Sequence, residues 1–207
     1  LAFLPQLLAA CKKEEIKVAF QGKVIIIGGG AAGMFAAYTL QHFGIDFVLL
    51  EASGQLGGRV KKTDDFADFP IDLGAEWIHA GTDIFSQLLK HGNQEGEIDV
   101  LPYNPETVYL GKDGNLTEMD FGSVIYGENK FSKSTWYDFF ADFVIPSIQD
   151  KVVLNAPVAG INYEGDEVVV TTESGAVYTA EKTVVTVPIK ILQSELINFT
   201  PELPQEQ

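Results

Sequence analysis

The sequence has few of the residues that build disulfides and metal sites. Its 207 residues include one cysteine, Cys11, so no internal disulfide can form. The three histidines, His42, His79 and His91, are not spaced from cysteine or carboxylate residues as metal ligands usually are. We therefore predict no metal site.

Basic residues are scarce relative to acidic ones. There are 14 lysines and arginines against 29 aspartates and glutamates, which gives a formal net charge of -15. Proteins that bind nucleic acid need a basic face for the phosphate backbone, so we expect no nucleic-acid partner. A net negative charge favours solubility and would attract a cationic substrate such as an amine.

The sequence also lacks an unbroken apolar run long enough to cross a bilayer. The longest run extends from Val24 to about Leu40, and the glycine cluster at residues 28–33 interrupts it. A buried strand followed by a closely packed helix explains this run better.

The first residues resemble the end of a secretory signal. The apolar stretch ends in Leu8-Ala9-Ala10-Cys11, which is similar to a bacterial lipobox whose cysteine carries the lipid. On this interpretation residues 1–21 are a leader and the protein is lipid-anchored at Cys11 or periplasmic, in a bacterial cell envelope. The alternative is a short amphipathic helix on a cytoplasmic protein.

Residues 23–51 predict one complete βαβ unit. Lys23–Ile27 is a β-branched run typical of a central parallel strand. A helix is expected from Ala31 to Phe43, with Gly44 at its C-terminal stop. Phe47–Leu50 then forms a second buried strand.

A glycine cluster joins the first strand to the helix. Gly28, Gly30 and Gly33 fit G-x-G-x-x-G, in which the glycines allow a tight turn, close approach of a pyrophosphate and close helix packing. The free N–H groups at the helix N-terminus, Ala31 and Ala32, would then face the phosphates.

An acidic residue, Glu51, ends the second strand, where it can hydrogen-bond ribose hydroxyls. Together with the glycine cluster it fits either NAD or FAD. The alternative is a structural turn with an incidental surface glutamate.

Residues 51–59, E-A-S-G-Q-L-G-G-R, resemble the second FAD fingerprint of the flavin amine oxidase family, E-A-x-x-x-x-G-G-R. The resemblance implies that this segment, from Glu51 and Ala52 onward, wraps the cofactor. It implies that Gly57 and Gly58 bring N–H groups to the pyrophosphate and that Arg59 supplies a charged donor fork. It favours FAD over NAD.

Residues 72–79, D-L-G-A-E-W-I-H, resemble a segment of the polyamine-oxidase-type members. The resemblance implies that Gly74, Ala75, Glu76 and Trp77 contact FAD and that His79 faces the substrate channel. Without the motif, Trp77 would more often be a core residue and His79 a hydrogen-bonded structural histidine.

Residues 152–187 predict a β-meander. The expected strands are Val152–Leu154, Val158–Tyr163, Glu167–Thr172, Val177–Thr179 and Thr183–Val187. Residues 153–158 and 186–189 match the family's returning FAD-domain strands, which implies that Val158 lies against the adenine. Residues 198–204 match the family's next segment.

The remaining elements are less regular. Extended structure is expected at Phe66–Asp72, a helix at Thr82–His91 with Thr82 as N-cap and Gly92 as stop, strands at Thr107–Leu110 and Leu116–Glu118, and a helix at Ser134–Ile145 that Pro146 bends or ends.

The fold class expected is α/β, a Rossmann-like FAD-binding βαβ domain with a β-meander and a small, incomplete substrate-domain excursion. The predicted divisions are 22–92 and 151–191 for the FAD-binding domain, 93–150 for the excursion and 192–207 for the start of a second one.

The resemblance implies an oxidoreductase that oxidises an amine at the carbon next to nitrogen, with oxygen as acceptor. We find no match to the family's flavin-proximal lysine or closing FAD segment, and expect no complete catalytic cycle from the chain alone. The alternatives are an inactive flavin-binding remnant, half of a split flavoprotein, or a related FAD desaturase or protoporphyrinogen-oxidase-like enzyme. An incomplete sheet edge would favour self-association.

Overall fold

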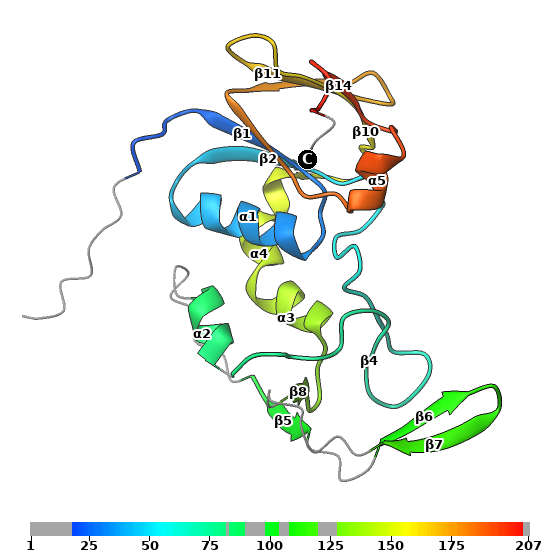
Figure 1. Cartoon of the computed structure of the whole chain (residues 1–207). Helices are drawn as coiled ribbons and strands as arrows, with labels where there is room; N and C mark the ends of the chain where they lie inside the picture. Colours follow the sequence, from blue (N-terminus) through cyan, green and yellow to red (C-terminus); the bar gives the residue numbers. More distant parts are fainter. Residues whose placement is uncertain (1–17, 82, 90–97, 104–107, 120–127, 205–207) are drawn as a thin grey trace, which may run out of the picture.

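The structure, a computed structural model, describes residues 18–81, 83–89, 98–103, 108–119 and 128–204 (Figure 1). The expected lipid anchor at Cys11, the N-cap at Thr82 and the helix stop at Gly92 lie outside these ranges and stay predictions.

A parallel four-stranded sheet lies at the centre of the fold. Its order is β13-β1-β2-β9, with bounds Lys182–Val185, Lys23–Ile27, Asp46–Leu50 and Val152–Val153. Each neighbouring pair is parallel. Ile25 and Ile26 are fully buried on opposite faces of β1, as expected of a strand covered on both sides. The two predicted strands of the βαβ unit are thus confirmed, the second with Asp46 added.

Helix α1 (Ala31–His42) connects β1 to β2 and covers one face of this sheet (Figure 1). Gly44 follows it with φ +67°, a conformation that costs glycine little, so the predicted stop is confirmed. Met34, Ala37 and Tyr38 are buried against the strands.

Further helices extend this layer beneath α1. Helix α4 (Ile145–Ile148) packs on α1, and α3 (Trp136–Phe143) packs on α4. Helix α2 (Asp83–Leu89) joins the same hydrophobic core through Phe85 and Leu89. The excursion therefore shares a core with the βαβ unit.

The predicted helix at Ser134–Ile145 is divided in two. The helix breaks at Val144, and Pro146 lies in the first turn of α4. Proline has no N–H to donate and disfavours helical geometry in the residue before it, so it starts a new helix instead of continuing the old one.

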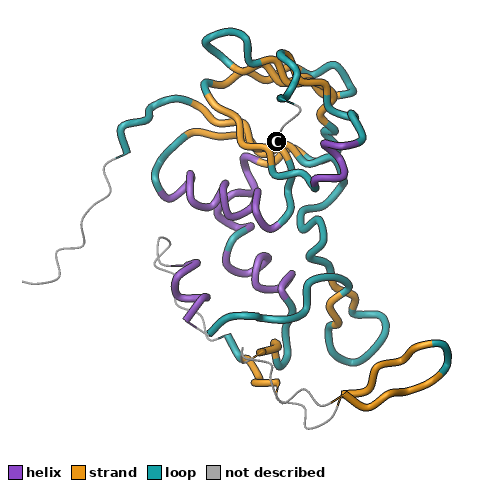
Figure 2. Tube along the Cα trace, viewed as in Figure 1, coloured by secondary structure: helices purple, strands orange, loops and turns teal. Residues whose placement is uncertain are grey.

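A second sheet covers the opposite face of the first (Figures 1 and 2). Its order is β12-β11-β10-β14, with bounds Val177–Ala180, Val168–Thr172, Val158–Asn162 and Asn198–Thr200. The first three strands are antiparallel neighbours, and β14 runs parallel to β10. Ile25 and Ile27 of the first sheet share a core with Ile161 and Val170 of the second.

The predicted β-meander over 152–187 is therefore wrong at both ends. Only β10, β11 and β12 form a meander, while β9 and β13 join the parallel sheet beside β2 and β1. Both short runs are apolar and β-branched, which fits either sheet. β13 and β9 join the parallel sheet because the buried backbone N–H and C=O groups at the edges of β1 and β2 need hydrogen-bond partners.

The other elements of the described ranges are short. Three two-stranded antiparallel sheets pair β3 (Lys62–Thr63) with β4 (Ile71–Asp72), β5 (Val100–Tyr103) with β8 (Glu128–Phe131), and β6 (Val108–Lys112) with β7 (Asn115–Met119). A turn of 3-10 helix (Gln149–Lys151) precedes β9, and α5 (Ile189–Gln193) follows β13.

The predicted extended segment Phe66–Asp72 forms a strand only at Ile71–Asp72. Phe66 and Phe69 are exposed, so no buried face holds residues 66–70 in a strand. The predicted strands near 107–110 and 116–118 are found as β6 and β7, apart from Thr107, which lies outside the described ranges.

The parallel sheet ends at β13 on one side and β9 on the other, and within the described ranges no further strand pairs with either. Self-association through such an edge stays a prediction. No helix in the described part of the chain has the length and apolar character that a membrane span requires.

Candidate functional site

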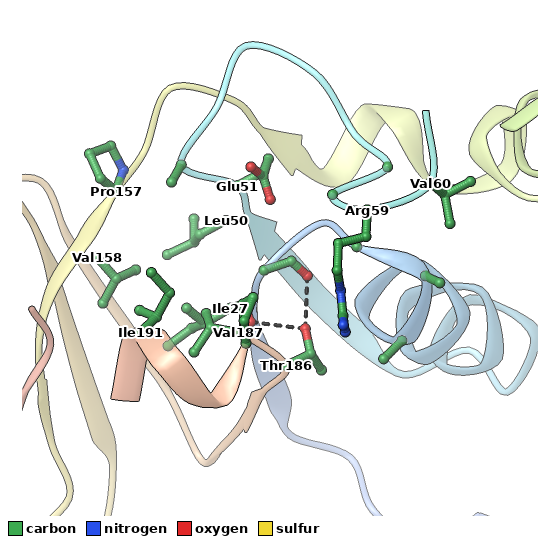
Figure 3. Close-up of a pocket in the computed structure, with 18 of the residues that line it drawn as sticks. Ile27, Leu50, Glu51, Arg59, Val60, Pro157, Val158, Thr186, Val187 and Ile191 are labelled. Carbon is green, nitrogen blue, oxygen red and sulfur yellow. Dashed lines mark hydrogen bonds between the residues drawn. The ribbon is translucent and has the colours of Figure 1, made fainter. Parts of the chain in front are cut away.

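A cavity of about 1040 Å³ lies at the carboxyl ends of the parallel strands (Figure 3). Ile27 and Leu50, the last residues of β1 and β2, line it, as does Thr186 just after β13. Ligands bind at this edge of parallel α/β sheets because the loops after the strands converge there. The volume is at the upper end of the range for small-molecule sites, about 300–1,000 Å³.

Most of the residues predicted to hold a cofactor line this cavity. They are Gly28, Gly30, Ala31, Ala32, Glu51, Ala52, Gly57, Gly58, Arg59, Gly74, Ala75 and Val158. The structure thus brings together residues that are far apart in the sequence.

The first glycine loop turns sharply after β1. Gly28 has φ +104°, and its N–H donates to the carbonyl of Leu50 at 2.8 Å. Gly33 lies below the loop, outside the cavity lining, and a Cβ there would stand 1.9 Å from the carbonyl oxygen of Gly28. A Cβ on Gly30 would meet nothing within 4 Å. The loop is therefore packed from below and open toward the cavity.

Helix α1 begins at this loop without a side-chain cap. Gly30 is its N-cap residue, and glycine has no side chain to accept the N–H groups of the first turn. Ala31 and Ala32 line the cavity. The helix N-terminus therefore offers backbone donors and a positive dipole end to an anion.

Glu51 ties the loops around the cavity together. Its Oε2 accepts the N–H of Gly29 at 2.6 Å. Its Oε1 accepts the N–H of Ser53 at 2.8 Å and the Ser53 hydroxyl at 2.7 Å. The carboxylate also lines the cavity, where it can accept further donors.

The second glycine loop packs directly on the first. The N–H of Gly57 donates to the carbonyl of Gly29 at 2.8 Å, and Gly57 pairs with Gly30 as an isolated bridge. Gly57 and Gly58 have φ +122° and +59°. A Cβ on Gly58 would stand 3.2 Å from the Cα of Gly30. Side chains would separate the two loops, so glycine is required for their contact.

Arg59 follows this loop and is the only arginine of the sequence. The segment at Gly74 passes over its backbone so closely that a Cβ on Gly74 would lie 1.8 Å from the Arg59 carbonyl oxygen. The N–H of Ala75 donates to the same oxygen at 3.3 Å. In Figure 3, Arg59 lies at one end of the cavity and Val158 at the other.

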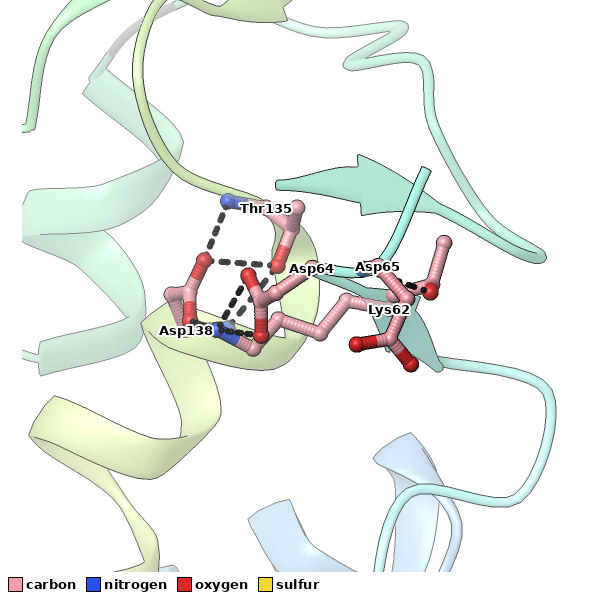
Figure 4. A network of polar contacts seen from close by, with 6 residues as sticks. Lys62, Asp64, Asp65, Thr135 and Asp138 are labelled. Atoms are coloured by element: carbon pink, nitrogen blue, oxygen red, sulfur yellow. Dashed lines mark hydrogen bonds and ion pairs between the residues drawn. The ribbon is translucent and has the colours of Figure 1, made fainter. Parts of the chain in front are cut away.

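A polar network joins this wall of the cavity to helix α3 (Figure 4). Lys62, which pairs with Asp72 in the β3–β4 hairpin, contacts the Asp138 carboxylate at 2.9 Å. Asp138 and Thr135 form the capping box of α3. The hairpin that continues from Arg59 and returns at Gly74 is thus anchored to a helix N-terminus.

Asp72 is the carboxyl group most altered by this environment. Burial raises the pKa of Asp72 to about 6. The N–H of Trp136, which donates to Asp72 at 3.3 Å, opposes the rise, and the carboxylates of Glu76 and Asp138 add to it. Asp72 therefore titrates nearer to neutral pH than an ordinary aspartate.

Besides Gly33, three of the predicted site residues do not line the cavity. Glu76 forms an ion pair with Lys130, whose ammonium lies 4.8 Å from the Trp77 ring centroid. His79 Nδ1 lies 3.2 Å from Glu128 Oε1 and is exposed. These contacts place Glu76, Trp77 and His79 along β8, and their cofactor and substrate roles stay predictions.

The cavity lining also contains residues that the sequence did not single out as site residues. They include Lys61, Leu73, Pro157, Glu173, Thr186, Val187, Pro188, Ile191, Leu196 and Ile197. Thr186-Val187-Pro188 belongs to a segment that matches the family's returning strands, and that match could have identified it. Within the described ranges, no group of three or more His, Cys, Asp or Glu could hold a metal ion.

Comparison with known proteins gives one family. The profile of the "Flavin containing amine oxidoreductase" family matches residues 31–133 and 135–207, which is most of the chain. The matched ranges contain the second glycine loop, Arg59 and the returning strands.

Individual proteins similar to this chain support the family match. Lysine-specific histone demethylase 2 of Homo sapiens is 26% identical over 264 residues, covering 89% of this chain and 32% of that protein. Polyamine oxidase 2 of Arabidopsis thaliana is 50% identical over 56 residues, covering 27% of this chain and 11% of that protein. Polyamine oxidase 4 of Oryza sativa subsp. japonica is 25% identical over 273 residues, covering 92% and 56%. The chain spans about a third of the length of the demethylase.

Proposed function

The chain belongs to the family of flavin containing amine oxidoreductases, and from this we propose that it binds FAD in the cavity at the ends of the parallel strands. One observation carries the proposal. Two glycine loops meet at Gly30 and Gly57, beside the Glu51 carboxylate, on one wall of a cavity of about 1040 Å³.

The shape of the cavity fits a dinucleotide. Gly30 has open space where a Cβ would stand, and the uncapped start of α1 lies beside it, which suits a pyrophosphate. Glu51 suits ribose hydroxyls, and Val158 and Pro157 give an apolar surface for adenine. Gly74 and Ala75 pack on the Arg59 backbone, and we assign them to the flavin side.

These features support FAD over NAD. The Gly57–Arg59 segment adds backbone donors and a permanent positive charge to the phosphate region, beyond what the first glycine loop supplies. The family match concerns flavin proteins, and the second loop lies within it. The Rossmann-like character of the domain belongs to this same proposal.

When bound, a flavin supplies the two-electron oxidation of a carbon–nitrogen bond. The described residues would bind and orient it. Glu51, the loop at Gly57 and the N-terminus of α1 would hold the nucleotide half, and Gly74 and Ala75 would hold the ring half. We propose that the reaction oxidises an amine at the carbon next to nitrogen, with oxygen as acceptor.

The activity of a whole protein is a wider proposal. The chain spans 32% of the human demethylase and 56% of the rice polyamine oxidase, so large parts of those proteins have no counterpart in it. For this chain we propose FAD binding. Amine oxidation is proposed for a protein in which this chain is combined with the substrate-binding residues. Flavin binding without turnover is the second candidate, and the position of Trp77 and His79 outside the cavity favours it for the 207-residue chain.

Binding is tested on the purified chain. Titration with FAD, ADP and NADH, followed by flavin fluorescence and calorimetry, should give tight FAD binding, measurable ADP binding and weak NADH binding. Tight binding of NADH without FAD would refute the cofactor assignment.

Turnover is tested separately. The FAD-loaded chain is mixed with monoamines, diamines, polyamines and a peptide that carries methylated lysine, and peroxide is followed. We expect FAD binding with no peroxide. A turnover rate on the order of 1 per second or faster would show that this chain alone builds a working substrate pocket.

A further inference from the structure

Thr186, the residue after strand β13, closes the first glycine loop. Its hydroxyl oxygen lies 3.0 Å from the carbonyl oxygen of Ile27 and 2.9 Å from that of Gly28 (Figure 3). Its N–H also donates to Ile27 at 2.9 Å. Thr186 lies 158 positions after Gly28, so only the tertiary fold creates this contact.

We propose that Thr186 is a positioning residue for the nucleotide phosphates, acting through the glycine loop. The inference rests on the proposed FAD site and names a residue that completes it. Thr186 fixes the orientation of the peptide group between Gly28 and Gly29, and that group sets the direction of the N–H groups that follow at the start of α1.

The peptide group between Gly28 and Gly29 is held at both ends. Its carbonyl oxygen accepts the Thr186 hydroxyl, and its N–H donates to Glu51 Oε2 at 2.6 Å. Thr186, just after β13, thus holds one end, and Glu51, just after β2, holds the other. Glycine permits many backbone conformations, so without both contacts this group could rotate.

Close packing below the loop makes the loop position sensitive to the side chain at Thr186. A Cβ on Gly33 would lie 1.9 Å from the Gly28 carbonyl oxygen and 2.9 Å from the Thr186 hydroxyl oxygen. The three groups therefore fill one small space. A methyl group in place of the Thr186 hydroxyl would stand 2.9 Å from a carbonyl oxygen, well inside ordinary contact of about 3.5 Å, and would push the loop away.

Strand β13, which ends just before Thr186, provides a matched control. Thr183 donates its hydroxyl to the carbonyl of Ile25 at 3.0 Å, an equivalent bond from β13 to β1 that lies away from the loop. Thr183→Val removes this bond, and Thr186→Val removes the bond at the loop. Thr186→Ser keeps the hydroxyl and removes only the methyl group.

The experiment measures dissociation constants for ADP and FAD with the full chain and these three variants. Loss of one hydrogen bond plus displacement of the loop should weaken binding of both ligands about tenfold in Thr186→Val. Thr183→Val and Thr186→Ser should bind within about twofold of wild type. In the ligand-free state, amide hydrogen exchange at Gly29 should be faster in Thr186→Val than in Thr183→Val.

Equal ligand affinity in Thr186→Val and Thr183→Val would overturn the proposal, and so would a large loss of affinity in Thr186→Ser. The serine variant decides the matter if Thr186→Val does not fold. A wild-type chain that binds neither ADP nor FAD would instead refute the proposed function, and this inference with it.

Discussion

The N–H of Gly29 and the carboxylate of Glu51 are joined by a 2.6 Å hydrogen bond across the two loops that follow β1 and β2. The second carboxylate oxygen holds Ser53 through its N–H and its hydroxyl. Glu51 therefore shapes the cavity before it meets a ligand, in addition to offering acceptors for ribose hydroxyls.

Glu51→Gln should weaken FAD binding and lower the melting temperature of the ligand-free chain. An amide has one acceptor oxygen, so either Gly29 or Ser53 loses its partner and faces an N–H donor instead. We expect a loss of about tenfold or more in FAD affinity. Calorimetric titration measures it, with Glu164→Gln on an exposed turn as control. Unchanged FAD affinity in Glu51→Gln would show that Glu51 is not part of the FAD site.

Arg59→Ala should weaken FAD binding more than Glu51→Gln does. Arginine gives a phosphate a charged pair of donors, and the loss removes the only arginine of the chain. The affinity of wild type should also fall more steeply with salt than that of Arg59→Ala. Arg59→Lys should recover part of the affinity, because a lysine keeps the charge and loses the fork.

Lys182→Ala, on the edge strand β13, is the control for a general loss of positive charge. The same salt dependence in wild type and Arg59→Ala would mean that Arg59 does not contact the phosphates.

Gly33→Ala should lower the stability of the fold, whereas Gly30→Ala should weaken FAD binding. The added methyl on Gly33 would stand 1.9 Å from the Gly28 carbonyl, and such overpacking should cost about 1–3 kcal/mol of stability. The methyl on Gly30 meets nothing within 4 Å, so Gly30→Ala should melt like wild type but lose FAD, because it fills the phosphate position. Thermal melts and FAD titration check both. A Gly30→Ala variant with normal FAD affinity would contradict the assigned phosphate site.

Asp72 should make the chain less stable as pH rises through about 6. Burial raises the pKa of Asp72 to about 6, so the folded state prefers the protonated form more than the unfolded chain does. The stabilisation is fully present below the unfolded pKa of about 4 and is lost as pH rises through the folded pKa.

Asp72→Asn should therefore raise the free energy of unfolding at neutral pH, by about 1 kcal/mol after solvent screening. It should also make the free energy of unfolding depend less on pH between about pH 4 and 6. Its amide oxygen can still accept the N–H of Trp136. Denaturant melts across this pH range measure the effect, with Asp150→Asn, on the exposed 3-10 turn, as control. Parallel pH profiles for wild type and Asp72→Asn would contradict the raised pKa.

Local patterns in the sequence determined the βαβ unit and the glycine loops. The β-branched run at Lys23–Ile27, the helix from Ala31 and the stop at Gly44 each follow from residues within a few positions. Steric rules for glycine act at short range, so the motif around Gly28 predicts its own turn. The motifs that carry the family resemblance also lie in short segments, and the family match agrees with them.

The tertiary structure alone decided which strands pair and which side chains meet. β9 and β13 have the same apolar, β-branched character as the meander strands, and only the open edges of β2 and β1 place them in the parallel sheet. Thr186 then reaches the Gly28 carbonyl from a distant part of the chain. A hydrogen bond between residues so far apart leaves no local pattern, because its geometry depends on the packing of the whole sheet.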